Sequence, residues 1–486
     1  MAEASLHRPY PAADVPGWDF ETDVAIVGFG AAGACAAIEA ADAGARVMLF
    51  ERGSGSGGAS ALSGGEIYIG GGGGTDAQRA AGFEDSTADF IAYLKAAGGP
   101  CADETKCELY GREALAHYDW LKAQGVPYRG NYLPGKHIEP TDDSTLIWSG
   151  SEAAWPFCDI AKPAPRGHVI AHMSWGGGRP LVDILEARAR ALGVEVMTDA
   201  RAMALIMDGT RVVGVVVRID NRDRFVRAGR GVVLCTGGFV FNEDMRRRYC
   251  PDSFKINSPL GDRDDGQGIA LGMSAGGDAI HMDQFFTTCP WTMPEPQAYG
   301  VFVNQAGQRF INEDCYHGRV SRHAVDQLGS CVYLLLDIAH FSEPLEMAGI
   351  TIAATGDSWE EVEAELEMAP GTLSRTMAFY NAHAAEGRDP LFHKRPPILT
   401  PLDQGPFVAL ELNFETSYFS FFTLGGLRTS VDGEVIDRAG EAIPGLFAAG
   451  RCTSGLPAWG HGYSSGLSLA DCTFFGRQAG RRAAAG

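Results

Sequence analysis

A glycine pattern close to the start of the chain constrains the fold more than any other feature. Residues 23–27 form a short apolar run, which is typical of a buried parallel strand. Gly28, Gly30 and Gly33 follow at once in the spacing G-x-G-x-x-G, and an alanine-rich segment over 31–43 predicts a helix. In such a turn the first glycine allows a tight bend, the second a close approach to a pyrophosphate, and the third close packing of helix on strand.

A second apolar run completes the pattern. Residues 46–50 predict the next strand, and Glu51 stands at its end. An acidic side chain about 20 residues after the glycines is placed to accept hydrogen bonds from ribose hydroxyls. The segment therefore predicts a βαβ unit that binds a dinucleotide at a helix N-terminus.

Composition excludes several classes of protein. The chain has 486 residues and a formal charge of −21. Such an acidic chain does not have the excess of basic side chains that attracts nucleic acid. Its 11 cysteines are scattered without C-x-x-C spacing, so zinc and iron–sulfur sites are unsupported and a reducing, cytoplasmic location is expected. No apolar run has the length of a transmembrane helix, although peripheral contact with a membrane surface stays open. We expect no metal site.

The remaining segments predict a discontinuous first domain. Residues 231–238 and 445–450 each predict a strand that runs into a glycine turn, and 466–485 predict a closing helix. The region 85–120 is expected to be helical, and a strand meander is expected over 194–217.

The middle of the chain differs from the rest in its sequence pattern. Prolines and the expected helices 359–367 and 373–385 indicate an inserted second domain. The predicted fold class is therefore α/β: a Rossmann-like FAD-binding domain over 1–284 and 413–486, with an inserted α+β cap domain over 285–412 for the substrate.

The choice of FAD comes from a resemblance. The glycine- and serine-rich segment 56–65 resembles the flavin-wrapping segment of fumarate-reductase-type flavoproteins, as do residues 236–238 and 444–450. That resemblance implies FAD, and Gly58 at the position of the attaching His in the covalent branch implies that the FAD is non-covalent. A second dinucleotide fingerprint is absent from the sequence, so the external electron acceptor is expected to be something other than NAD(P).

The residues expected to bind the cofactor lie in these glycine segments and beside them. They are Gly28, Gly30, Ala31, Ala32, Gly33, Glu51, Arg52, Gly58, Ala59, Ser60, Ser63, Gly64, Gly65, Ala202, Thr236, Gly237, Gly238, Asp265, Gly450, Arg451, Ser468 and Leu469.

The positions that clamp dicarboxylates in the fumarate-reductase branch are uncharged in this chain. Alignment of the family's motifs places Phe286 and Phe421 where that branch has His, and Ser465 where it has Arg. Guanidinium and imidazolium groups are what bind carboxylates. Their replacement predicts an aromatic pocket for a large apolar molecule, with Phe286, Phe421 and Trp459 among its lining residues.

The motifs resemble those of the 3-ketosteroid dehydrogenases, and most closely their Δ4-(5α) branch. Residues 163–168, 313–319, 449–455 and 462–466 carry the resemblance. It implies that Tyr463 donates to the substrate carbonyl, while Tyr316 and Ser465 form the proton path. His317 and Arg319 are candidates to assist them.

The expected function is α,β-dehydrogenation of a 3-ketosteroid at C4–C5, with the C4 hydrogen leaving as a proton and the C5 hydrogen as hydride to flavin N5. Enone reduction and Δ1-dehydrogenation are the alternatives within enzymes. A non-catalytic electron-transfer flavoprotein subunit is the alternative outside them.

Overall fold

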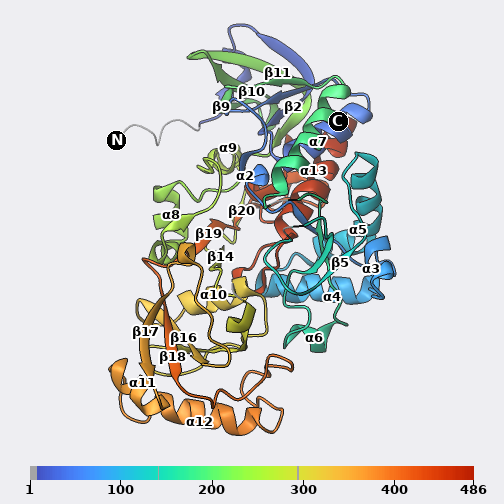
Figure 1. Ribbon diagram of the computed structural model, residues 1–486. Helices are drawn as coiled ribbons and strands as arrows, with labels where there is room; N and C mark the ends of the chain where they lie inside the picture. The colour runs from blue at the N-terminus through green and yellow to red at the C-terminus, as the bar shows by residue number, and fades with distance from the viewer. Residues whose placement is uncertain (1–7, 141, 174, 293–294) are drawn as a thin grey trace.

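The computed structural model describes residues 8–140, 142–173, 175–292 and 295–486 (Figure 1). The predicted βαβ unit is confirmed as β2 (Phe20–Val27), α1 (Ala31–Asp42) and β3 (Val47–Phe50), with β2 and β3 parallel. Helix α1 lies against α13 (Leu467–Ala485), the predicted closing helix. A Cβ atom at Gly480 would lie 2.1 Å from the Ala36 carbonyl oxygen, so small residues are required where the two helices cross.

The main sheet joins segments from both ends of the chain. Within the described residues it has nine strands in the order β1-β9-β10-β11-β2-β3-β8, and β22 extends it from β11 and carries β21. The other strands of this sheet are β1 (Tyr10–Pro11), β8 (Glu195–Met197), β9 (Arg201–Asp208), β10 (Arg211–Ile219), β11 (Arg222–Leu234), β21 (Glu434–Ile436) and β22 (Ala442–Ala448). The predicted meander corresponds to β8, β9 and β10, and α7 (Gly178–Ala191) packs on α1.

Two helices form the region predicted to be helical over 85–120. Helix α4 (Thr87–Gly98) ends where Gly99 takes a φ of +50°, and α5 (Glu104–Ala123) starts after Asp103 caps its first turn. Both pack near a small sheet with the order β4-β7-β6-β5. Its strands are β4 (Glu66–Tyr68), β5 (Tyr132–Lys136), β6 (Leu146–Trp148) and β7 (Gly167–Val169).

The middle of the chain builds a second layer at the bottom of Figure 1. Its sheet has the order β15-β16-β18-β17, and α11 (Trp359–Glu365) and α12 (Leu373–Ala384) cover it with a core of their own. The strands are β15 (Val301–Asn304), β16 (Cys331–Asp337), β17 (Thr351–Gly356) and β18 (Phe407–Asn413). These elements fall in the predicted inserted segment, except for Asn413 at the end of β18.

Short strands and α10 lie between the two layers in Figure 1. One three-stranded sheet has the order β12-β19-β14, and β13 pairs with β20. These elements are β12 (Ser258–Pro259), β13 (Ala279–Ile280), β14 (Phe285–Thr288), β19 (Ser420–Thr423), β20 (Gly426–Leu427) and α10 (His317–Val325). The remaining helices are α2 (Gly58–Ala61), α3 (Asp76–Ala80), α6 (Phe157–Ile160), α8 (Glu243–Tyr249) and α9 (Gln267–Ser274).

All eleven cysteines are unpaired. Among the described helices, none combines the length and the apolar character needed to cross a membrane.

Candidate active site

The turn after β2 is shaped so that only glycine fits at its key positions. Gly28 has a φ of +101°, and a Cβ there would lie 2.4 Å from the Cys235 carbonyl oxygen. A Cβ at Gly33 would lie 1.9 Å from the Gly28 carbonyl oxygen. The bare backbone of this turn leads into the N-terminus of α1, and the backbone N–H groups and dipole at a helix N-terminus attract phosphate.

Glu51 holds the next loop in place at the end of β3. Its carboxylate accepts hydrogen bonds from the backbone N–H groups of Phe29, at 2.8 Å, and Gly53, at 2.7 Å. The same carboxylate lines the cleft above the glycine turn. Across that cleft Arg52 Nη1 lies 2.5 Å from Asp265 Oδ2, so the predicted cofactor residues Arg52 and Asp265 form an ion pair.

Most of the predicted cofactor residues line this one cleft. They are Gly28, Gly30, Ala31, Ala32, Glu51, Arg52, Gly58, Ala59, Ser60, Ala202, Thr236, Gly237, Asp265, Gly450 and Arg451. A narrow site that joins a helix N-terminus, an acidic side chain and a glycine turn matches the shape and chemistry of a dinucleotide, so the residues present fit FAD.

The other predicted cofactor residues lie outside the lining of this cleft: Gly33, Ser63, Gly64, Gly65, Gly238, Ser468 and Leu469. Gly65 instead packs on the start of α7, where a Cβ would lie 2.3 Å from the Gly177 carbonyl carbon. Gly238 packs on the Thr423 hydroxyl.

The two tyrosines singled out in the sequence meet around Phe286. The Tyr463 ring centroid lies 4.3 Å from that of Phe286 and 6.5 Å from that of Tyr316. Tyr316 precedes α10, and Tyr463 follows a short turn before α13, so segments far apart in sequence bring the two phenols together. Both rings are buried, at 6% and 5% exposure.

The Tyr463 hydroxyl donates a hydrogen bond to Ser468 Oγ at 3.0 Å. Burial raises the pKa of Tyr463 to about 12, although the hydrogen bond with Ser468 opposes the rise. The side chain is therefore a neutral phenol near neutral pH and a hydrogen-bond donor. Ser468, which stays a predicted cofactor residue, is the partner of Tyr463 in this structure.

Tyr316 and Ser465 are neighbours. Burial raises the pKa of Tyr316 well above its usual value, the nearby Tyr463 and Glu66 side chains raise it further, and a hydrogen bond with the Ser465 hydroxyl opposes them. The backbone N–H of Tyr316 donates to Ser151 Oγ at 3.1 Å, which fixes the start of α10. The structure thus brings together the three predicted catalytic residues.

The aromatic partner of Phe286 is Phe422 rather than Phe421. In the antiparallel pair of β14 and β19, Phe286 lies opposite Phe422, so the two rings share one face with centroids 4.9 Å apart. Phe421 points to the other face, where it is fully buried beside Phe285 and beneath the Arg246 guanidinium. We therefore replace Phe421 with Phe422 in the candidate pocket.

Trp459 covers the end of α4 and lines neither the cleft above the glycine turn nor the cavity beside Tyr316. A Cβ at Gly99 would lie 2.3 Å from Trp459 Cε3, so the indole fills the space that this glycine leaves. The neighbouring His461 turns to Asp326, with Nε2 and Oδ2 2.5 Å apart.

The two candidate assistants differ in placement. The His317 ring lies 4.3 Å from the Tyr316 ring, between centroids. Arg319 instead donates from Nη1 to the His461 carbonyl oxygen at 2.7 Å and lies over the Phe157 ring, so its charge supports the loop before Tyr463.

A cavity of about 510 Å³ opens beside Tyr316 and His317. Its walls include Trp148, Pro397 and Ile398, so the small sheet and the end of the inserted segment both contribute. A cavity of this size is large enough for a drug-sized ligand.

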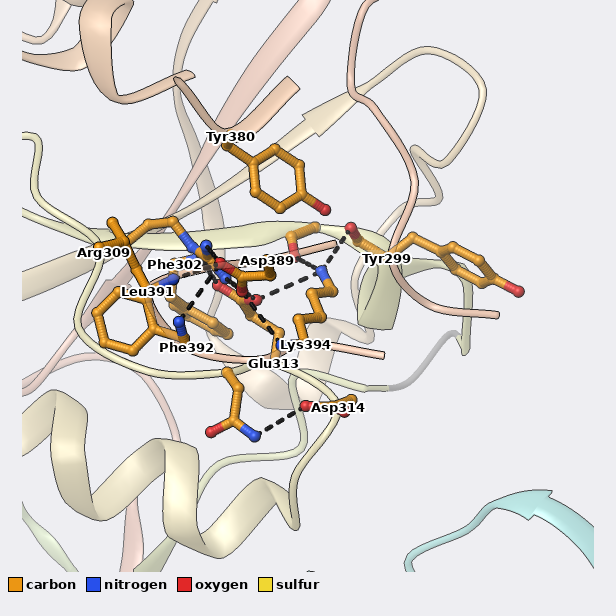
Figure 2. A network of polar contacts seen from close by, with 12 residues as sticks. Tyr299, Phe302, Arg309, Glu313, Asp314, Tyr380, Asp389, Leu391, Phe392 and Lys394 are labelled. Carbon is orange, nitrogen blue, oxygen red and sulfur yellow. Dashed lines mark hydrogen bonds and ion pairs between the residues drawn. The ribbon is translucent and has the colours of Figure 1, made fainter. Parts of the chain in front are cut away.

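A buried charge network anchors the segment that carries Tyr316 (Figure 2). Arg309 contacts two carboxylates, with Nη2 3.0 Å from Glu313 Oε2 and 3.0 Å from Asp389 Oδ2. Lys394 Nζ lies 3.4 Å from the same Glu313 oxygen. Burial alone would raise the pKa of Asp389, but the Arg309 guanidinium and backbone donors lower it below its usual value.

The comparison with known families agrees with this geometry. Residues 23–467 match the family model described as an FAD binding domain. The chain belongs to this family.

Two relatives of the flavoprotein share nearly its whole length. It is 29% identical to the 3-oxo-5-alpha-steroid 4-dehydrogenase of Comamonas testosteroni, over 90% of this chain and 94% of that protein. It is 26% identical to the vinyl phenol reductase of Lactiplantibacillus plantarum, over 95% of this chain and 96% of that protein.

A solved structure matches the flavoprotein throughout. The 3-ketosteroid Δ4-(5α)-dehydrogenase of Rhodococcus jostii RHA1, solved with 4-androstene-3,17-dione, is 41% identical with a TM-score of 0.92. The match covers 98% of this chain and 99% of that one.

Two residues of the flavoprotein's site escaped the sequence analysis. Phe422 directly follows the motif position Phe421, and the strand register together with the ring contact shows that Phe422 is the phenylalanine that faces Tyr463. Glu66 follows directly after Gly64 and Gly65 and lies beside Ser465. A charged residue inside an otherwise apolar strand was the available signal.

Proposed function

We propose that the chain is an FAD-dependent 3-ketosteroid dehydrogenase that forms a double bond between C4 and C5 of its substrate. The observation that supports this most directly is the group of Tyr316, Tyr463 and Ser465 around an aromatic face, with Phe286 where the fumarate branch has a charged clamp. The steroid dehydrogenase of known structure, similar over the whole chain, supports the same substrate class.

Each hydroxyl has a role that its surroundings favour. Tyr463, held neutral by burial, donates to the substrate carbonyl and stabilises the developing enolate. Tyr316 takes the proton from the α-carbon, and Ser465 passes it on, because its hydroxyl is the neighbour that favours the ionised form of Tyr316. A bound flavin supplies the acceptor for the hydride from the β-carbon.

FAD is held without a covalent bond in this proposal. Gly58 lines the cleft and offers no side-chain atom for attachment. The electrons then leave to an external acceptor other than NAD(P), because the sequence has a single dinucleotide fingerprint.

Enone reduction is the second candidate. The vinyl phenol reductase aligns over nearly the full length, and the same phenols could protonate an enolate as readily as form one. A non-catalytic electron-transfer subunit would not require the three hydroxyls to meet.

Anaerobic titration separates these candidates. A saturated 3-ketosteroid should bleach the flavin absorbance, whereas succinate should leave it unchanged. Rapid reoxidation of pre-reduced flavin by an enone, with no bleaching by the saturated ketone, would support the reductase. Failure of both ketones to change the spectrum would support the electron-transfer subunit.

A further inference from the structure

Two of the proposed catalytic residues are tied to one short segment, residues 149–151, which follows β6. The backbone N–H of Tyr316 donates to Ser151 Oγ at 3.1 Å, and that of Ser465 donates to the Ser149 carbonyl oxygen at 2.9 Å. Both of these serines are buried. Because Tyr316 and Ser465 come from distant parts of the sequence, their relative placement depends on where this segment lies.

A phenol from another part of the chain holds the segment. Tyr93 lies in α4, and its hydroxyl oxygen accepts a hydrogen bond from the Ser151 backbone N–H at 3.0 Å. The same oxygen lies 2.7 Å from Ser464 Oγ, in a hydrogen bond with the residue directly before Ser465. One hydroxyl therefore joins the segment that contacts Tyr316 to the turn that carries Ser465.

The space around this hydroxyl is filled. A Cβ at Gly150 would lie 2.5 Å from the Tyr93 hydroxyl oxygen and 2.4 Å from Ser464 Oγ, so a larger residue there would displace one of them. The segment, the turn and the phenol are thus in close contact, and a shift of one would move the others.

The ring that carries the hydroxyl is held in the core. It stacks on Tyr68, with centroids 5.6 Å apart, and the Arg166 guanidinium lies over it at 5.0 Å. Arg166 is fixed in turn by a fully buried ion pair with Asp85, whose Oδ1 lies 2.7 Å from Nη2. A ring packed in this way gives its hydroxyl a defined position, which a group that sets the spacing of other residues requires.

We propose that Tyr93 is a positioning residue of the active site, whose hydroxyl sets the spacing of Tyr316 and Ser465. This inference rests on the proposed dehydrogenation. Tyr93 lines neither the cleft above the glycine turn nor the cavity beside Tyr316, and it acts through the backbone of the two catalytic residues. The role does not depend on which hydroxyl takes the proton of the substrate, because Tyr93 fixes only where these groups lie.

Tyr93→Phe in the FAD-loaded enzyme tests this role. Phe keeps the ring and removes the oxygen, which leaves the Ser151 N–H and the Ser464 hydroxyl without this partner in the core. Because buried polar groups require hydrogen bonds, the segment should shift toward new partners. A misplacement of about 1 Å can cost roughly 100-fold in rate, so the limiting rate of flavin reduction by a saturated 3-ketosteroid should fall roughly 10- to 100-fold.

Two further readouts separate positioning from other roles. The substrate concentration that gives half the limiting rate should keep its wild-type value, because Tyr93 does not line the cavity. The rate should also keep the wild-type pH dependence, because no proton of the reaction passes through Tyr93. A changed pH profile in Tyr93→Phe would place this phenol in the proton path and overturn the positioning role.

Tyr380→Phe is the matched control. Tyr380 is another buried phenol, and its hydroxyl donates to the Thr400 carbonyl oxygen at 2.9 Å within the inserted segment. The variant loses a buried hydrogen bond of the same kind and should keep the wild-type rate. An equal fall in rate in the two variants would mean that any lost buried hydrogen bond slows the enzyme, and would overturn a specific role for Tyr93.

Ser464→Ala is a second variant that decides the question if Tyr93→Phe does not fold. It removes the other end of the contact and should also slow flavin reduction. The two changes combined should cost less than the product of the single effects, because both break one contact. Wild-type rates in both single variants would overturn the inference while leaving the dehydrogenation intact. An unreduced wild-type flavin would instead overturn the proposed function.

Discussion

Arg309 and Glu313 form a buried ion pair, with Nη2 3.0 Å from Oε2 and side chains only 4% and 0% exposed. Glu313 lies three residues before Tyr316, and its Oε1 accepts from the Phe302 backbone N–H at 3.0 Å. A charge network in the core of the inserted segment thus fixes the chain just before Tyr316, whose ring lies near that of Tyr463.

Arg309→Met should destabilise the protein strongly. The change leaves Glu313 and Asp389 buried with Lys394 as the remaining cation of the network, and breaking a buried pair typically costs about 3–5 kcal/mol. Urea unfolding of the holoenzyme measures the loss. Arg247→Ala, which removes an exposed pair with Glu243, should cost under about 1 kcal/mol. Equal losses in the two variants would contradict this account.

Phe421→Ala and Phe422→Ala should separate core packing from the pocket. Phe421 is fully buried, so its truncation should cost about 3–5 kcal/mol of stability. Phe422 is partly exposed beside Phe286 and Tyr463, so its truncation should raise the substrate KM with a smaller loss of stability. Thermal unfolding and steady-state kinetics on both variants check this. A raised KM in Phe421→Ala together with the larger loss of stability in Phe422→Ala would mean that Phe421 lines the pocket.

The βαβ unit was predictable because its signals are local. Glycine spacing, an alanine-rich helix and short apolar strands are each recognised from neighbouring residues in the sequence. The predicted ends of the helix and of the two strands differ from the observed ends by only a few residues. The hydrophobic spacing continues through the break between α4 and α5 and does not locate it, although Gly99 and Pro100 mark the turn.

The site was only partly predictable. Motifs identified Tyr316, Tyr463 and Ser465, but which face a phenylalanine occupies depends on strand register, and a shift of one residue exchanges the two faces. That is why Phe421 was chosen over Phe422. Glu66 was not identified, because it and Ser465 lie in segments about 400 residues apart, and no local pattern encodes such a contact.

Denaturing the protein should release its FAD as the unmodified cofactor. Acid precipitation should release yellow FAD into the supernatant, because Gly58 provides no attachment atom; flavin retained in the pellet would contradict this.

Glu51→Arg should weaken FAD binding about 10- to 100-fold, the effect of losing a hydrogen bond to a charged group. Fluorescence titration of the apoprotein measures this. Glu84→Arg, at an exposed position outside the cleft lining, is the control and should bind as the wild type does.

Removing the active-site hydroxyls one at a time should slow flavin reduction without loss of colour. Tyr463→Phe removes the donor to the enolate and little volume, and loss of one such donor costs roughly 10²–10³ in rate. Tyr316→Phe and Ser465→Ala interrupt the proton path, which is worth roughly 10²–10⁴. The Tyr316 and Ser465 changes combined should cost less than the product of the single effects, because both groups serve one proton transfer. Stopped-flow reduction isolates this step from reoxidation.

Phe285→Leu, on the opposite face of β14, controls for repacking of the strand and should keep most of the rate. Wild-type reduction in all three hydroxyl variants would place the chemistry elsewhere.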